Sequence, residues 1–215
     1  MKRSPQSIQR LACLFSTFRN HPIGFGERMN PQDEMLPTRL NRTVVYESPW
    51  VNLYRDKVAL PTGHIIEQYH LLDFGHGAVA IIVENEERQI LMERVSRYPT
   101  GTTTWELPAG GIEDNESILT AAQREVREET GYETFKHQQI YKYHPMNGIA
   151  NMTVHVIHCQ AGRGTGQWDE NEVRAIQWFS VEEIEEMIQR QEITDGFALI
   201  GLMLHLNQHS AQRAG

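Results

Sequence analysis

The stretch REVREETG, residues 124–131, carries five charged residues within its first six positions and ends at a glycine. In a helix, Glu125 and Glu129 lie one turn apart and Glu128 lies beside them. Like charges at that spacing repel by about 0.2–0.5 kcal/mol per pair, so an ordinary surface helix gains nothing from the arrangement. The stretch therefore indicates a helix with a special purpose, and we expect its carboxylates to face outward from the core.

Crowded carboxylates favour a bound cation, because without one each raises the pKa of its neighbours. Mg²⁺ takes oxygen ligands and typically binds through a few carboxylates together with substrate phosphate. Arg124 lies one turn before Glu128 and can hold that carboxylate in an ion pair. The alternative is a solvated acidic face, which is the commoner meaning of such a charge run when it stands alone.

The segment directly before the helix favours the metal site. It reads WELPAGG, residues 105–111, and its glycines allow the backbone to approach a ligand closely. Carbonyl and amide groups in a tight turn can reach a metal ion or a phosphate. The turn and the acidic helix together favour a binding site over a plain acidic surface.

Short stretches rich in β-branched and aromatic residues predict strands on both sides of this centre. They lie at residues 43–58, 65–74, 77–83, 89–95, 138–143 and 152–159, with turns at 61–63 and 84–87. Strands first, a central helix, and then strands and helices predict an α+β layered domain and not a regular βαβ repeat.

Three helices are expected from their capping residues. Asn115 is the expected N-cap of the central helix, and Gly131 its left-handed C-terminal residue. Ser180 and Glu183 form a capping box for a second helix, and Asp195 can cap a third. The apolar stripe of the third helix comprises Leu199, Leu202, Met203 and Leu206.

Composition bounds the class of protein. The 215 residues are 40% hydrophobic, which fits one domain with an appendage, and the formal net charge is −8. An acidic chain disfavours a nucleic-acid-coating role, and no apolar run approaches the roughly 20 residues of a membrane span. Cys13 and Cys159 lie far apart and outside any metal-binding pattern, so we expect a reducing, cytoplasmic environment.

The first 26 residues contain four basic residues and no acid, with apolar side chains at helical spacing. This pattern is typical of a transit peptide. The alternative is a disordered or over-extended start, with Met29 or Met35 as the true beginning. We expect residues 1–40 to form a weakly ordered extension.

The turn and the central helix together resemble the sequence box of the Nudix hydrolases, Gx5Ex7REUxEExGU, where U is bulky and apolar. The matching residues are Gly110, Glu116, Arg124, Glu125, Val126, Glu128, Glu129, Gly131 and Tyr132. The resemblance implies the family's α/β/α sandwich with a mixed β-sheet, here preceded by a small antiparallel β region. It also implies hydrolysis of a nucleoside diphosphate linked to another moiety, with Mg²⁺ or Mn²⁺ as cofactor.

The segment ELPAGGIE, residues 106–113, is similar to the box entrance of the ADP-ribose pyrophosphatases. In that branch an alanine carbonyl and two box glutamates ligate the metal, which implies Ala109, Glu125 and Glu129 as ligands here. Glu128 is expected in the same catalytic site, with Glu106 nearby.

The same resemblance suggests groups that bind substrate. Arg97 looks like the arginine that grips the substrate's phosphates, with a surface arginine as the alternative. Trp50 occupies the place of an aromatic that stacks on the base, often across a domain-swapped dimer, and a core aromatic is the competing interpretation. Tyr69 is a second candidate for stacking.

The acidic loop DENE, residues 169–172, resembles the loop that delivers the catalytic base in the ADP-ribose branch. A positioned carboxylate that takes the proton of the attacking water contributes typically about 10²–10⁴-fold. Loop position favours Glu170, with Glu172 second, and an exposed turn is the alternative. Residues 145–151 depart from the pattern of that branch, which leaves the terminal sugar open.

Histidines at 144, 155 and 158 raise the question of zinc. His155 and His158 are three residues apart in a predicted strand and so point to opposite faces. The sequence therefore favours structural or surface roles for them.

These observations lead to one hypothesis with named rivals. We expect a weakly ordered segment at 1–40, a β-hairpin region with a possible dimer swap at 41–75, and a catalytic domain at 76–210. The expected function is Mg²⁺-dependent cleavage of ADP-ribose or a related nucleoside diphosphate sugar by a homodimer without nucleic-acid or membrane partners. The alternatives are GDP-mannose or another nucleotide sugar as substrate, or a non-catalytic module that binds ADP-ribose.

Overall fold

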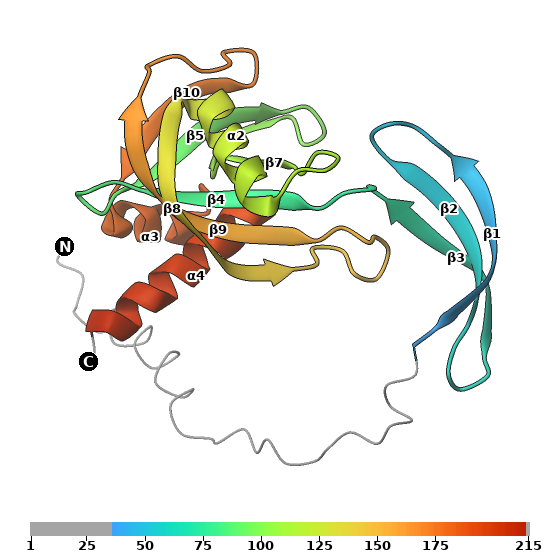
Figure 1. Ribbon diagram of the computed structural model, residues 1–215. Helices are drawn as coiled ribbons and strands as arrows, with labels where there is room; N and C mark the ends of the chain where they lie inside the picture. The colour runs from blue at the N-terminus through green and yellow to red at the C-terminus, as the bar shows by residue number, and fades with distance from the viewer. Residues whose placement is uncertain (1–35, 214–215) are drawn as a thin grey trace.

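The computed structural model describes residues 36–213, and most of them form a body built on one mixed sheet (Figure 1). Its strands run in the order β10-β5-β4-β9-β8, with β6 paired to β5 and β7 paired to β4. The bounds are β4 (Ala78–Glu84), β5 (Ile90–Arg97), β6 (Thr102–Glu106), β7 (Ala109–Gly111), β8 (Tyr132–Tyr143), β9 (Val154–Gly164) and β10 (Val173–Phe179). The central β4 and β9 run parallel and the neighbouring pairs run antiparallel.

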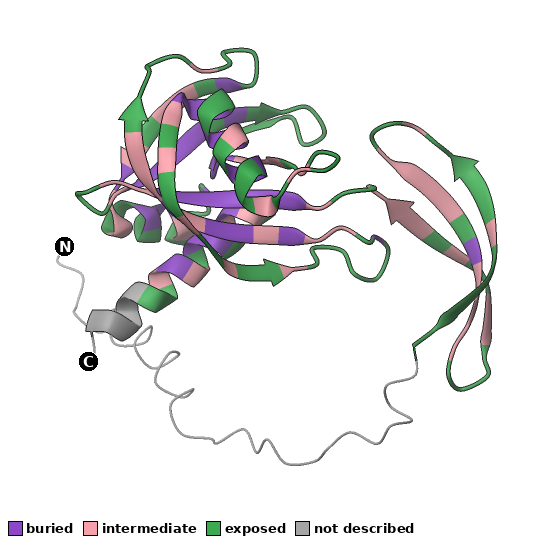
Figure 2. Ribbon diagram, in the orientation of Figure 1, coloured by how far each residue is buried: buried purple, intermediate pink, exposed green. Residues whose placement is uncertain are grey.

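Helices cover both faces of this sheet. Helix α2 (Ile118–Thr130) packs on one face, and α3 (Val181–Gln189) and α4 (Gly196–Arg213) pack on the other. Strand β4 serves both layers, because Val79 and Ile81 contact the core under α2 while Ile82 contacts the core under α4. Figure 2 shows the burial concentrated in these central elements. The body is the expected α/β/α sandwich.

The helix ends agree with the sequence at most positions. Gly131 is left-handed (φ 70°) and donates its N–H to the Arg127 carbonyl, and the Ser180 capping box forms as predicted. Asp195 accepts from the Ala198 N–H at 2.8 Å. The expected cap of α2 was wrong, since Ser117 accepts from the Thr120 N–H instead.

Asn115 and Met203 both lie outside the roles that the sequence predicted for them. Asn115, the expected cap, lies before the helix in a left-handed conformation (φ 63°). Met203, assigned to the apolar stripe of α4, is 53% exposed, whereas Leu202 of the same stripe is fully buried.

Several strands differ from the sequence pattern. Residues 43–58 contain parts of two strands, and β8 starts six residues earlier than expected, directly after Gly131. Strands β6, β7 and β10 were not predicted. They are stabilised by pairing with β4 and β5, which a local pattern does not show.

A separate antiparallel sheet precedes the body and lies to one side of it (Figure 1). It comprises β1 (Thr38–Tyr46), β2 (Asn52–Ala59) and β3 (Ile65–Asp73), with β2 in the middle. A bridge between Leu72 and Ala150 and a hydrogen bond from the Tyr69 hydroxyl to the Gly148 carbonyl (2.6 Å) join it to the body. We call it the N-terminal sheet.

The sequence raised the questions of an N-terminal transit peptide and of a membrane span. The possible transit peptide lies outside the described residues. Within residues 36–213, no helix is long and apolar enough to cross a membrane.

A buried acidic site between the central helix and the sheet

Strand β7 brings the glycine turn into contact with α2. Ala109 pairs with Ala80 of β4, which fixes the turn on the sheet. Gly110 then lies directly against Glu125, and a Cβ at this position would overlap the Glu125 carboxylate. The contact requires glycine at position 110, so the turn and the acidic helix form one unit.

The carboxylates of α2 do not all face outward, and this expectation was wrong. Glu125 and Glu129 are 9% and 7% exposed, and the Ala109 N–H donates to Glu129 Oε2 at 3.0 Å. The side chain of Glu128 is 59% exposed. Two acids thus point into the gap between α2 and β7, and the third lies at its rim.

Arg124 organises these acids. Its Nε and Nη2 bind both oxygens of Glu116 at 3.0 Å, and its Nη2 also donates to the Gly111 carbonyl at 2.8 Å. Its Nη1 lies 2.8 Å from Glu125 Oε1 and 3.4 Å from Glu128 Oε2. The guanidinium of Arg124 lowers the pKa of Glu116, and the carboxylates raise the pKa of Arg124 in turn. The predicted pair with Glu128 is therefore one part of a larger network.

Glu93 of β5 is an acid of this site that the sequence analysis did not identify. It is 1% exposed, and neither carboxylate oxygen has a hydrogen-bond partner. Burial, followed by Glu129 and Glu106, raises its pKa to about 10. Its signal in the sequence is a lone acid within the apolar run of β5, and strand pairing places it opposite Glu106 of β6.

The acids are poised for a cation. Burial, followed by the charge of Glu125, raises the pKa of Glu129 to about 8, and burial also raises the pKa of Glu125. Buried carboxylates that repel one another and include a pair of oxygens without partners fit a divalent metal with oxygen ligands. The donor set of this site therefore suits such an ion.

Arg97 lies at the edge of this site, at the end of β5. Its Nη2 lies 2.7 Å from Glu106 Oε2, and Glu106 is only 2% exposed. The side chain of Arg97 remains 47% exposed. Glu106 thus fixes one edge of the guanidinium group, through Nε and Nη2, while the rest of the Arg97 side chain remains exposed and can contact a ligand.

The two candidate bases of the acidic loop differ in their surroundings. Both Glu170 and Glu172 are exposed. The charge of Glu172 contributes to the raised pKa values of both Glu93 and Glu129. The Asp169 N–H donates to the Glu128 carbonyl at 3.1 Å, which anchors the loop to α2. Of the two candidates, Glu172 is the one whose charge acts on the buried acids.

The aromatic candidates are not brought to the acids within this chain. Trp50 lies between β1 and β2 and is 85% exposed, so the alternative of a core aromatic was wrong. Tyr69 lies at the seam between the N-terminal sheet and the loop that contains Gly148. Both residues belong to the sheet that lies beside the body.

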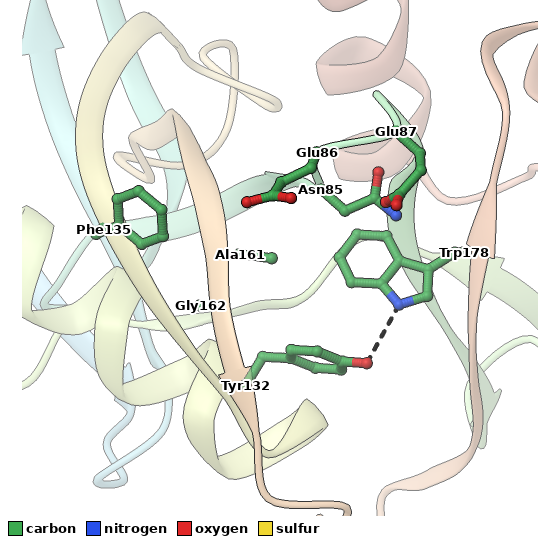
Figure 3. Close-up of a pocket in the computed structure, with 8 residues that line it drawn as sticks. All are labelled: Asn85, Glu86, Glu87, Tyr132, Phe135, Ala161, Gly162 and Trp178. Carbon is green, nitrogen blue, oxygen red and sulfur yellow. Dashed lines mark hydrogen bonds between the residues drawn. The ribbon is translucent and has the colours of Figure 1, made fainter.

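A pocket of about 450 Å³ lies elsewhere, between the start of β8, the β4–β5 turn and Trp178 of β10 (Figure 3). Its aromatic wall is Tyr132 with Trp178, whose Nε1 donates to the Tyr132 hydroxyl at 3.2 Å. Glu86 and Glu87 of the β4–β5 turn also line it. None of the acids between α2 and β7 contributes to this pocket.

Comparison with known families places two known modules along the chain. The family model of the NUDIX domain matches residues 75–197. A second model, described as the nucleoside diphosphate sugar hydrolase N-terminal domain, matches residues 38–72, which includes most of the N-terminal sheet.

Curated relatives resemble this chain over most of its length. A CMP-5'-(N-acetyl-N-hydroxy-3-aminopropyl)phosphonate hydrolase of Streptomyces rubellomurinus is 30% identical over 79% of this chain and 82% of its own. An ADP-ribose pyrophosphatase of Bacillus subtilis is 28% identical, covering 70% and 82%. An ADP-ribose pyrophosphatase of Mycobacterium tuberculosis is 30% identical, covering 70% and 74%.

A solved structure described as an ADP compounds hydrolase shares the fold. It has a TM-score of 0.72 over 83% of this chain and 96% of its own, with 18% sequence identity.

Proposed function

The chain belongs to the Nudix family, and from this premise we propose that it hydrolyses the pyrophosphate bond of ADP-ribose or a related nucleoside diphosphate sugar. The products are a nucleoside monophosphate and a sugar phosphate. The observation that carries the proposal is the buried pair Glu125 and Glu129, held against the Ala109 turn and organised by Arg124. The N-terminal match to nucleoside diphosphate sugar hydrolases supports this choice of substrate class.

Nudix enzymes generally use a divalent metal, and we propose Mg²⁺, with Mn²⁺ as a substitute. Glu125, Glu129 and the Ala109 carbonyl would hold it, with Glu128 at the rim. A divalent ion bound there supplies positive charge to phosphate oxygens and orients water. Arg124 holds Glu125 in place through its contact at 2.8 Å, so the ligands are positioned before the substrate binds.

Other residues bind and orient the substrate. The exposed part of Arg97 would hold the diphosphate, while Glu106 fixes the guanidinium at 2.7 Å. Trp50 would stack on the base, with Tyr69 as a second aromatic. Because Trp50 lies on the exposed N-terminal sheet, we propose that it reaches the site of a second copy in a swapped homodimer.

We assign the base to Glu172 in preference to Glu170. Water attacks one phosphorus of the diphosphate, the bond from that phosphorus to the bridging oxygen breaks, and the bridging oxygen leaves on the other phosphate. The carboxylate takes the proton of the attacking water. Glu172 is favoured because its charge acts on Glu93 and Glu129, at the centre of the site.

The range of substrates is the open part of the proposal. GDP-mannose or another nucleotide sugar is the nearest alternative, and a CMP-linked compound is a second, because one relative is named for such a substrate. A non-catalytic module that binds ADP-ribose is the alternative from another class. We propose a cytoplasmic enzyme without nucleic-acid partners, on the basis of its acidic composition and the free thiol of Cys159.

Product analysis tests the proposal. Purified protein is incubated with Mg²⁺ and, separately, with ADP-ribose, GDP-mannose, UDP-glucose, NADH and a CDP-linked alcohol, and the products are separated by chromatography. Glu129→Gln should lower kcat by orders of magnitude. Glu185→Gln, an exposed acid on α3, is the matched control and should leave turnover unchanged.

The outcomes separate the alternatives. Release of AMP from ADP-ribose supports the main proposal. Preference for another nucleotide would change the assigned substrate but leave the assigned reaction, pyrophosphate hydrolysis, in place. No turnover, with ADP-ribose still bound, would favour the binding module. A loss of kcat of about 10²-fold or more in Glu172→Gln, with a small effect of Glu170→Gln, identifies the base.

A further inference from the structure

A second group of potential metal ligands lies on the face of the sheet opposite α2. It consists of Glu84 at the end of β4, His158 of β9 and His205 of α4. One ligand atom from each side chain lies within 4.8 Å of the other two. We call this group the His-Glu cluster.

Sheet pairing and helix packing bring these distant residues together. His158 is opposite Ile82 in the parallel pair of β4 and β9, so Glu84 lies two residues further along the same face. Helix α4 packs on this face through the fully buried Leu202, and His205 follows one turn later. The cluster therefore joins α4 to the two central strands.

The contacts within the cluster are close. His158 Nε2 donates to Glu84 Oε2 at 2.8 Å. The rings of His158 and His205 stack with centroids 5.7 Å apart and planes 14° from parallel. His205 is 3% exposed, whereas the side chains of Glu84 and His158 are 12% and 26% exposed, so the cluster opens to solvent beside His158.

Two imidazoles and one carboxylate form a different donor set from the acids at α2. Histidine nitrogens suit Zn²⁺ and other transition metals, whereas Mg²⁺ prefers oxygen ligands. Two histidines with one glutamate are a known zinc ligand set that leaves a fourth position for water. We propose that Glu84, His158 and His205 bind Zn²⁺ or a similar divalent transition metal. This site is separate from the metal site between α2 and β7.

The geometry needs only small side-chain movements to close around an ion. Zinc bonds of about 2.0–2.2 Å to nitrogen and oxygen place tetrahedral ligand atoms about 3.4 Å apart. The 2.8 Å separation of His158 Nε2 and Glu84 Oε2 must widen, and the ligand atom of His205, which lies within 4.8 Å of the other two, must settle at a similar spacing. The metal replaces the proton that His158 Nε2 now donates to Glu84, so binding releases that proton.

The surroundings of Glu84 also fit a ligand. Arg88 Nε lies 3.3 Å from Glu84 Oε1, the oxygen that does not contact His158. Such an outer partner orients a ligating carboxylate and leaves its other oxygen for the metal. A bound ion would link α4 directly to β4 and β9.

Metal titration of the intact protein tests the proposal. Chelator-treated protein is titrated with Zn²⁺, and separately with Co²⁺, in a millimolar excess of Mg²⁺ that occupies the acidic site. We expect one equivalent of Zn²⁺ to bind, to raise Tm, and to release protons. Co²⁺ should give a visible absorption band typical of nitrogen ligation.

Variants identify the ligands. His158→Gln and Glu84→Gln should each weaken Zn²⁺ binding by more than the roughly 10–100-fold typical of losing an outer-shell partner. His155→Gln is the matched control, because His155 lies on the same strand but faces the other side of the sheet, where it contacts Gln139 at 2.9 Å. This variant should bind Zn²⁺ as the native protein does. His205 is too buried to be the first variant.

Several results would overturn the proposal. Zinc binding that survives both His158→Gln and Glu84→Gln would do so, as would binding lost in Glu129→Gln, since that ion would sit at α2. Absence of any zinc equivalent above the Mg²⁺-filled site would also exclude it. Because nucleotide hydrolysis is not measured, the result does not depend on the proposed function.

Discussion

The body and the N-terminal sheet are stabilised in different ways. Six of the seven residues of β4 are buried, and side chains from both faces of that strand enter separate apolar cores. In the strands of the N-terminal sheet, Asp56 is the one buried residue, while Leu40, Val44 and Tyr46 are more than half exposed. The body thus contains its own core, and the N-terminal sheet does not.

The difference indicates that the two regions need different support. A three-stranded sheet is stable in water only with an apolar face covered or with packing against another element. The hydrogen bonds that join the N-terminal sheet to the body run from β3 to residues 148–151, so they leave its exposed apolar side chains uncovered and suited to a second copy of the chain. The buried acids of the proposed site, Glu93, Glu125 and Glu129, lie in the body, and the exposed aromatic Trp50 lies in the N-terminal sheet.

The largest predicted effect tests how closely the body is packed around its acids. Gly110→Ala should lower kcat by about 10²-fold or more, because the new Cβ overlaps the Glu125 carboxylate and displaces a proposed ligand. Gly111→Ala is the matched control, since a Cβ at that position meets open space, and its kcat should change little. Circular dichroism checks that both variants fold. Equal activity of the two variants would contradict the assigned geometry.

Much of the geometry of α2 could be predicted from the sequence, because it depends on residues that are close together along the chain. Arg124 and Glu128 are one turn apart and pair as expected, and Gly131 takes the left-handed conformation that ends α2. The sandwich follows from the resemblance to a family. The burial of Glu125 and Glu129 was not foreseen, because it depends on how β7 packs against the helix.

Long-range pairing explains what the sequence could not reveal. Glu93 reads as an ordinary charged residue until β5 pairs with β6 and places it opposite Glu106. The cluster of Glu84, His158 and His205 joins three distant segments, and no spacing between them predicts it. Hydrophobic patterns report on single elements, whereas these sites arise between elements.

The second prediction concerns pH and the buried acids of the body. The pKa of Glu129 is raised from 4.5 to about 8 in the folded protein, so the folded state holds the proton more tightly than the unfolded state. Its contribution to stability is present below pH 4.5 and is lost as pH rises through about 8. Without metal, Tm should therefore fall between pH 5 and pH 8.

Thermal unfolding in chelator across this range checks the second prediction. Glu129→Gln should flatten the decline, because the amide does not titrate. Mg²⁺ should raise Tm more at pH 8 than at pH 5, since it binds the charged carboxylates. An identical slope in the native protein and in Glu129→Gln would show that another group controls it.

The third prediction concerns the one buried charge of the N-terminal sheet. Arg42 binds Asp56 through two contacts of 2.8 and 2.7 Å. Asp56→Ala should destabilise the N-terminal sheet by about 1.5–3 kcal/mol, the usual range for hydrogen bonds to charged groups. Hydrogen exchange should accelerate in β1–β3 while the strands of the body stay protected.

An exposed pair in the same sheet provides the control. Lys57 and Glu67 lie 2.9 Å apart with side chains 42% and 66% exposed, so Glu67→Ala should cost less than about 1 kcal/mol. Faster exchange throughout the body of Asp56→Ala would mean that the two regions unfold together. That result would remove the distinction between them.

The smallest predicted effect concerns Trp50, which we propose brings the N-terminal sheet into contact with substrate at the site in the body. Trp50→Ala should raise KM about fivefold at unchanged kcat, because base–aromatic stacking is worth about 1 kcal/mol at the lower end of its range. Tyr46→Ala, on the same exposed sheet, is the control and should leave KM unchanged. If Trp50 serves the site of a partner, the difference between native protein and Trp50→Ala should vanish when dilution separates the dimer, as followed by sedimentation. A difference that persists in monomers would place Trp50 in the site of its own chain, and equal KM values in the dimer would remove it from substrate binding.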